Sequence, residues 1–164
     1  MMEDLLMYKR VVVPLDGSPV AEGMWRFIVD IAGPLDLEVV LLRVIRILPP
    51  QVTETLRSAL LESVDQNTAD AREYLAPLAK DLGTRGIRVR TEVRHGEPVD
   101  EIIECAREAD ADLIAMTTHG RSGLGRLLFG SVAEAVLRQA EIPVFLMRMT
   151  EAQVADGAVG PALR

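Results

Sequence analysis

Residues 112–134 read DLIAMTTHGRSGLGRLLFGSVAE, and they carry the clearest structural signal in the chain. The apolar run DLIAM at its start predicts a buried strand. The segment SVAE at its end predicts a helix start, with Ser131 as the N-cap and Glu134 completing a capping box. A strand followed by a glycine-rich loop and a helix is typical of an α/β fold.

The loop between this strand and this helix has a composition suited to holding a phosphate. It carries Arg121 and Arg126, and four glycines at positions 120, 123, 125 and 130. Glycine allows a ligand to approach the backbone closely, and a helix N-terminus offers unpaired N–H donors. Glycine-rich loops also occur with nothing bound, so the local chemistry leaves both possibilities open. The loop is not a Walker A motif, and Leu128 replaces the last glycine of a G-x-G-x-x-G fingerprint.

Apolar runs on either side of this stretch predict alternating strands and helices. Strands are expected at residues 11–15, 37–45, 87–94, 113–117 and 142–147, and helices at residues 21–32, 52–82, 99–109 and 131–140. Pro77 predicts a bend or break in the longest helix. The alternating pattern of 87–94 indicates an edge strand, and Pro143 favours an edge or a strand start. The order of elements predicts an α/β fold with an open five-stranded parallel sheet and helices on both faces.

Composition narrows the class of protein. The 164 residues are 49% hydrophobic and 26% charged, a globular balance that predicts one domain over residues 1–149 and a flexible tail over 150–164. A net charge of −7 argues against broad nucleic-acid binding. No apolar run reaches the ~20 residues of a membrane span, and residues 1–7 do not resemble a signal peptide, so a cytoplasmic location is expected. Cys105 has no partner for an intrachain disulfide and is expected to pack inside a helix.

In parallel sheets, ligands bind outside the carboxyl ends of the strands. The segments that leave those ends are 14–18, 44–48 and 116–130, so the glycine-rich loop and Asp16 are expected on the same face. The Asp16 carboxylate could accept hydrogen bonds from a ribose or help to hold a metal. It could instead start the Asp-Gly-Ser-Pro turn through its own backbone. The sequence leaves these roles open.

No group of residues predicts catalysis. His119 has no carboxylate or nucleophile placed near it in the sequence, and His95 lies in a turn where solvent exposure is expected. No His/Cys/Asp cluster has the spacing of a zinc site. Ser122 and Ser131 lack the setting of a nucleophile elbow. The sequence therefore predicts neither a catalytic constellation nor a metal site built from side chains.

Several segments together resemble the universal stress protein family over about residues 7–149. They are VVVPLDGS at 11–18, LLRV at 41–44, THGRSGL at 118–124, GSV at 130–132 and IPVFLM at 142–147. The resemblance implies an open sheet of strand order 3-2-1-4-5, Rossmann-like and similar to the adenine nucleotide alpha hydrolases. One branch of the family binds ATP through a G-x-x-G-x9-G-[S/T] motif. Gly120, Gly130 and Ser131 match that motif, whereas Thr117 stands at its first glycine position.

The resemblance implies a site for an adenine nucleotide, ATP or AMP, with Mg²⁺ or Mn²⁺ accompanying a triphosphate. The implied site residues are Pro14, Asp16, Val44, Met116, Thr117, Gly120, Arg121, Gly130, Ser131 and Val132. Asp16 would contact the ribose, Pro14 and Val44 would line the adenine pocket, and the loop and helix start would meet the phosphates. The resemblance also implies a homodimer through the last strand, Ile142–Met147.

Three functions fit these expectations. The first is a cytoplasmic stress protein that binds an adenine nucleotide as a sensor or switch. The second is a slow ATPase on the same site, which needs a positioned water and a charge-stabilising group, although no base is evident. The third is a family member that binds no nucleotide and acts through protein contacts, which the threonine at position 117 favours slightly.

Overall fold

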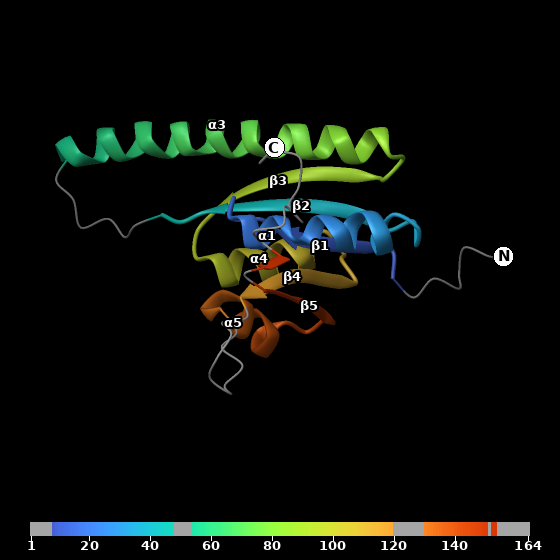
Figure 1. The fold of residues 1–164 in the computed structure, drawn as a ribbon. Helices are drawn as coiled ribbons and strands as arrows, with labels where there is room; N and C mark the ends of the chain where they lie inside the picture. The colour runs from blue at the N-terminus through green and yellow to red at the C-terminus, as the bar shows by residue number, and fades with distance from the viewer. Residues whose placement is uncertain (1–7, 48–53, 120–129, 151, 154–164) are drawn as a thin grey trace.

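The computed structural model describes residues 8–47, 54–119, 130–150 and 152–153 (Figure 1). Its strands are β1 (Arg10–Pro14), β2 (Glu38–Ile45), β3 (Val89–His95), β4 (Leu113–His119) and β5 (Val144–Met149). They form one parallel sheet in the order β3-β2-β1-β4-β5. This confirms the expected five-stranded sheet and its order 3-2-1-4-5. Most of the glycine-rich loop (120–129) and nearly all of the predicted tail lie outside the described residues.

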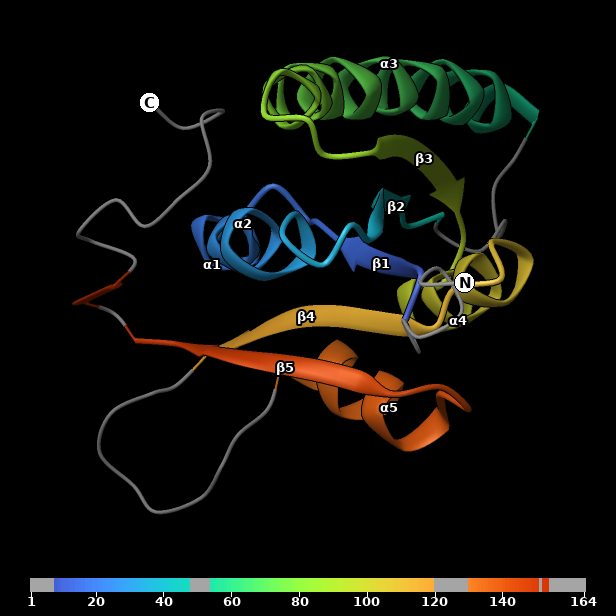
Figure 2. The same ribbon diagram turned by 90° about the vertical axis from the view of Figure 1, so that its right-hand side faces the viewer.

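Helices cover both faces of the sheet (Figure 2). One face carries α1 (Pro19–Glu22), α2 (Met24–Phe27), the π-helical segment η2 (Ile28–Ala32) and α3 (Glu54–Thr84). The other face carries α4 (Pro98–Glu108) and α5 (Ser131–Gln139). In β1, Val11 and Val13 belong to the first core and Val12 to the second, and all three are fully buried. A strand covered on both faces is therefore apolar at successive positions.

The helix predicted at 21–32 is three short segments instead. The chain enters a helix at Pro19 and turns at Gly23, where an added Cβ would lie 2.6 Å from Cε of the buried Met149. This close approach of β5 explains why position 23 is a glycine. In η2 the Gly33 N–H donates to the Ile28 carbonyl (2.8 Å), which is the five-residue spacing of a π-helix.

Of the bend or break expected at Pro77, the break is wrong, because α3 runs without interruption over 31 residues. Leu75, Leu78 and Leu82 are buried and hold the helix on the sheet. Proline has no N–H, so the Glu73 carbonyl lacks its usual donor four residues on. Glu73 and Pro77 both lie on the exposed side of α3, where water can donate to that carbonyl. Among the described helices, α3 included, none combines the length and the apolar content that crossing a membrane requires.

The two edge strands of the sheet are β3 and β5, as the sequence indicated. β5 begins and ends two residues later than predicted. The Pro143 carbonyl accepts from the Ile114 N–H (3.0 Å), but Pro143 has no N–H of its own, so the strand begins at Val144.

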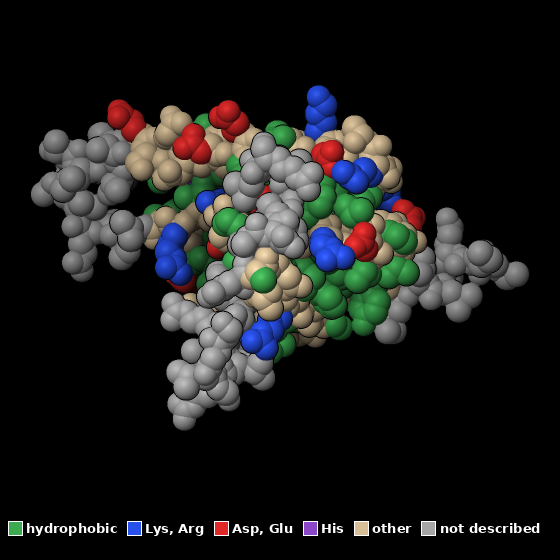
Figure 3. Space-filling view, in the orientation of Figure 1, with side chains coloured by type: hydrophobic (Ala, Val, Ile, Leu, Met, Phe, Trp, Pro, Cys, Tyr) green, Lys and Arg blue, Asp and Glu red, His purple; other side chains and the backbone are tan. Residues whose placement is uncertain are grey.

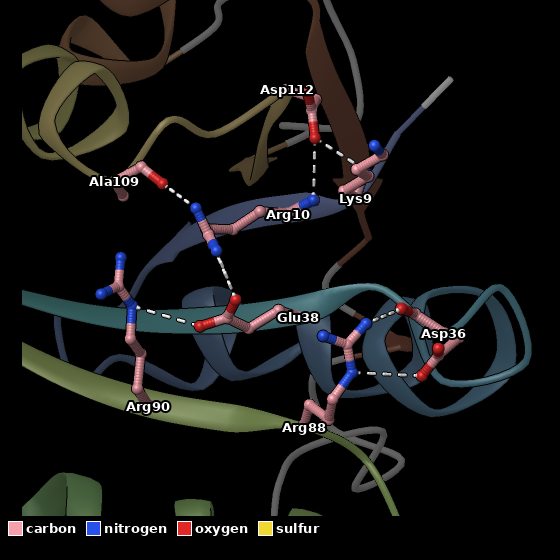
Figure 4. Close-up of polar contacts among 8 residues, drawn as sticks. All are labelled: Lys9, Arg10, Asp36, Glu38, Arg88, Arg90, Ala109 and Asp112. Carbon is pink, nitrogen blue, oxygen red and sulfur yellow. Dashed lines mark hydrogen bonds and ion pairs between the residues drawn. The ribbon is translucent and has the colours of Figure 1, made fainter. Parts of the chain in front are cut away.

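Charged side chains join the amino ends of the strands (Figure 4). Arg10 on β1 pairs with Glu38 on β2 at 2.7 Å, and Arg90 on β3 approaches the same carboxylate at 3.5 Å. The Asp112 carboxylate, just before β4, accepts from the backbone N–H groups of Lys9 (2.6 Å) and Arg10 (2.9 Å). These contacts align the strands at one end of the sheet and leave its carboxyl end for a pocket.

Candidate functional site

A pocket of about 470 Å³ opens at the carboxyl ends of β1, β2 and β4, within the usual size range of small-molecule sites. Eight of the ten residues implied by the sequence line it: Pro14, Asp16, Val44, Met116, Thr117, Gly130, Ser131 and Val132. The other two, Gly120 and Arg121, lie outside the described residues. The structure therefore brings the described part of the implied set to one place.

The turn after β1 carries the Asp16 carboxylate to the rim of this pocket. Asp16 Oδ1 accepts from the Ser18 N–H (2.8 Å), and Gly17 takes a positive φ of 81°. Ser18 Oγ then accepts from the Ala21 N–H (3.2 Å) and caps α1. Asp16 thus does start the turn, as one of the two sequence interpretations held. That contact uses one oxygen of a carboxylate that also borders the pocket, so it does not exclude a ligand role.

The inner part of the pocket is an apolar slot. Leu42 and Val44 of β2, Met116 of β4 and Ile102 of α4 contribute to it, and Leu42, Met116 and Ile102 are buried. The apolar lining thus comes from two strands and a helix. A slot of this composition suits a flat group with apolar faces.

The outer part of the pocket is formed by the start of α5. The predicted capping box is wrong: Gly130 is the N-cap, Ser131 is the first helical residue, and the cap has no side-chain hydrogen bond. Glu134 instead pairs with Arg138 at 2.6 Å. The first backbone bond of the helix runs from the Glu134 N–H to the Gly130 carbonyl (3.0 Å). The N–H groups of residues 131–133 therefore have no acceptor within the helix, at the positive end of its dipole.

Glycine at position 130 is not required by the described protein itself. Its φ of −56° is open to any residue, and an added Cβ would meet no described atom within 4 Å. Gly130 is one of the residues that line the pocket. A glycine at this position leaves the helix start accessible to a ligand as far as the described residues go.

Thr118 is a pocket residue that sequence reasoning missed. It is 6% exposed, and its Oγ1 has no hydrogen-bond partner among the described residues. Leaving a buried hydroxyl unpaired costs about 1–3 kcal/mol. The signal in the sequence was a second threonine at the end of an otherwise apolar strand.

A second cluster missed by sequence reasoning lies behind the Asp16 turn. The Tyr74 hydroxyl donates to Glu22 Oε1 (2.9 Å), and Glu22 is 2% exposed. Burial raises the pKa of Glu22, and burial together with the nearby Glu22 carboxylate raises the pKa of Tyr74. Arg43 donates to the Leu15 carbonyl (3.2 Å), with its guanidinium carbon 5.9 Å from the centre of the Tyr74 ring. These residues come from α1, α3 and β2, so no local sequence motif predicts their contacts.

Neither histidine is placed among the described pocket residues. His95 is half-buried rather than exposed, because α3 passes over the end of β3 and brings Thr68 Oγ1 to 2.8 Å from His95 Nε2. His119 is the last residue of β4. Cys105 is buried in α4 as expected, and burial raises its thiol pKa. Within the described ranges, no group of three or more His, Cys, Asp or Glu side chains could hold a metal.

Comparisons with known proteins agree on one family. The model of the universal stress protein family matches residues 7–148. Universal stress protein MJ0531 of Methanocaldococcus jannaschii is 35% identical over 147 residues, which covers 87% of this chain and 83% of that protein. Universal stress protein UspA from Lactobacillus plantarum has a similar structure, with a TM-score of 0.74 at 25% identity over 86% of this chain and 98% of that one.

A third relative has been solved with a ligand. The universal stress protein from Archaeoglobus fulgidus in complex with dAMP has a TM-score of 0.60 at 24% identity, over 85% of this chain and 98% of that one. At this identity the likeness shows the shared fold. The match of the family model across nearly the whole chain and the 35% identity to MJ0531 show that this chain belongs to the universal stress protein family.

Proposed function

We propose that this chain binds an adenine nucleotide, ATP or AMP, in the pocket at the carboxyl ends of β1, β2 and β4. It would act in the cytoplasm as a nucleotide-dependent sensor or switch in the stress response. One observation carries the proposal: a single pocket combines an apolar slot, a carboxylate at its rim and the unpaired N–H groups of a helix start. These three features match the base, the sugar and the phosphates of a nucleotide.

Each part of the nucleotide has a counterpart of suitable chemistry. The adenine would lie in the slot between Val44 and the α4 side of the pocket, beside Pro14 and Met116. The Asp16 carboxylate would accept hydrogen bonds from ribose hydroxyls. The phosphates would lie at the start of α5, where N–H groups and the helix dipole favour negative charge.

The remaining residues of the implied site would complete the phosphate end. Gly120 and Arg121, on the segment that follows β4, would add backbone and guanidinium contacts. Mg²⁺ or Mn²⁺ would be held mainly by the phosphate oxygens of a triphosphate, since the described side chains form no metal-binding cluster. The dAMP complex of the Archaeoglobus fulgidus protein concerns that protein, and the proposal here rests on this chain's own pocket.

We also propose that β5 joins two copies into a homodimer. β5 is an edge strand, and its residues Val144, Phe145, Leu146 and Met147 are all only half-buried. Figure 3 shows hydrophobic side chains gathered on the side of the molecule that carries the α1–η2 segment and β5. An apolar edge strand of this kind favours pairing with another strand.

The experiment that tests the nucleotide proposal is mass spectrometry of small molecules released from freshly purified, denatured protein, followed by calorimetric titration with ATP and AMP. Co-purified ATP, ADP or AMP, or saturable binding in the titration, would support it. Absence of both would favour the alternative that this family member acts through protein contacts alone. Turnover of ATP under the same conditions would instead favour the slow ATPase.

A further inference from the structure

We infer that Arg43 is a positioning residue, which holds the Asp16 turn so that its carboxylate faces the ribose and the pocket selects ribonucleotides. This inference rests on the proposed nucleotide site. Arg43 itself does not line the pocket, whereas its neighbours Leu42 and Val44 do. The proposed role of Arg43 therefore rests on its contacts with other residues and not on a direct contact with the ligand.

Arg43 forms a hydrogen bond with Leu15, the residue that precedes Asp16. The Leu15 N–H donates to the Leu42 carbonyl (2.8 Å), and the Leu15 carbonyl accepts from Arg43 Nη1 (3.2 Å). Both backbone groups of Leu15 are thus bound to β2. This fixes the chain at the point where β1 ends and the Asp16 turn begins.

Arg43 also packs against the residue that follows Asp16. A Cβ built on Gly17 would lie 3.7–3.9 Å from three atoms of the guanidinium group. Gly17 has the positive φ that the turn requires, and Asp16 Oδ1 accepts from the next N–H, that of Ser18. The guanidinium group therefore packs against the turn at Gly17, and the Asp16 carboxylate of the same turn borders the pocket.

The guanidinium group is itself held in place by the cluster around Tyr74. It lies over the Tyr74 ring at 5.9 Å, within the range of a cation–π interaction. The Tyr74 hydroxyl in turn binds Glu22 of α1, the helix that the Asp16 turn enters. The turn, α1, α3 and β2 thus form one connected unit, with Arg43 as the member that touches the turn directly.

These contacts predict a specific effect of removing Arg43. The apolar slot and the start of α5 come from other elements and would keep their contacts with the base and phosphates. Of the proposed nucleotide contacts, the one between Asp16 and the ribose hydroxyls depends most directly on the turn. A nucleotide that has ribose hydroxyls should therefore lose affinity, and one that lacks them should not.

The test uses Arg43→Met in the full chain, with two readouts. The first is hydrogen exchange at the Ser18 amide in nucleotide-free protein, measured by NMR. The second is calorimetric affinity for AMP and for 2′,3′-dideoxy-AMP. Loss of one charge-assisted hydrogen bond should speed Ser18 exchange and weaken AMP binding by about tenfold each, with less than about twofold change for the dideoxy ligand. Arg43→Lys keeps a donor for the Leu15 carbonyl and should restore most of the AMP affinity.

Arg46→Met is the matched control, because Arg46 is an exposed arginine just beyond β2 that pairs with Glu97 at 3.0 Å. It should change neither readout. Equal weakening of both ligands by Arg43→Met, or no change in Ser18 exchange, would overturn the positioning role. Failure of the wild-type chain to bind AMP would overturn the proposed function and the ribose selection with it. The exchange rates would then still decide whether Arg43 holds the turn.

Discussion

Tyr74 of α3 donates a 2.9 Å hydrogen bond to Glu22 of α1, a carboxyl group that is 2% exposed. The second carboxyl oxygen of Glu22 has no partner among the described residues. The charges of Arg43 and Asp16 act on the pKa of Tyr74, and neither residue forms a hydrogen bond with Glu22 in the described contacts. Burial therefore dominates, and it raises the pKa of Glu22 above its value in the unfolded chain.

The raised pKa of Glu22 makes stability depend on pH. The Glu22 carboxyl binds its proton more tightly in the folded state than in the unfolded state. Its contribution to the free energy of unfolding is therefore fully present below the unfolded pKa of 4.5. It is lost as pH rises through the folded pKa. Glu22→Gln keeps an acceptor for Tyr74 and carries no charge, so it should stabilise the protein at pH 7.

Urea unfolding at pH 4 and pH 7 checks this prediction. The free energies of unfolding of wild type and Glu22→Gln should be similar at pH 4 and diverge at pH 7. Glu62→Gln, at an exposed position of α3, provides the control substitution. A difference that is the same at both pH values would show that folding does not shift the pKa of Glu22.

The proposed dimer predicts that a charge on β5 separates the two copies. Leu146→Lys places a cation in a half-buried position of the edge strand, where it would disfavour strand pairing. Light scattering after size-exclusion chromatography should give twice the 18.0 kDa chain mass for the wild type and the single mass for the variant. Leu137→Lys, on the exposed side of α5, should remain dimeric. A monomeric wild type would contradict the proposal.

Most of the fold could be predicted because its signals are local. The apolar runs of β1 and β4 are long enough to show burial on both faces, and the alternation in β3 shows an edge. The N-cap of α5 was predicted one residue late, at Ser131 instead of Gly130. Gly130 and Ser131 are both good N-caps, and the choice depends on the backbone dihedrals, which composition does not specify.

The pocket was predictable as a place, but its supporting residues were not. Asp16, Val44 and Ser131 lie at strand ends or at a helix start, so topology alone brings them together. Tyr74 and Glu22 are 52 positions apart in the sequence, and their contact depends on where α3 lies over the sheet. Sequence periodicity gives the buried face of α3 but not its position along β2.

Thr118 offers a test in which stability and binding change in opposite directions. Thr118→Val removes a buried hydroxyl without a described partner and keeps the side-chain shape, so it should raise the free energy of unfolding by about 1 kcal/mol. If that hydroxyl binds the nucleotide, AMP affinity should fall by about tenfold. Thr118→Ser keeps the hydroxyl and should retain the affinity. Unchanged binding in Thr118→Val would remove Thr118 from the site.

Gly130 gives the sharpest test of the phosphate end. Its dihedrals suit any residue and an added Cβ meets no described atom within 4 Å, so Gly130→Val should fold with nearly unchanged stability. A branched side chain there would stand between a phosphate and the N–H groups of α5, and should weaken AMP binding by at least about 30-fold. Gly83→Val is the matched control, since an added Cβ at Gly83 also meets no described atom within 4 Å, far from the pocket.

Calorimetry on both variants separates two causes of weaker binding. Loss of affinity in Gly130→Val alone, with thermal unfolding like that of the control, would locate the effect at the start of α5. Equal affinity in both variants would mean that no phosphate approaches this helix. The open space before Gly130 would then serve another ligand or none, and the nucleotide proposal would lose the feature that distinguishes the pocket from a plain apolar slot.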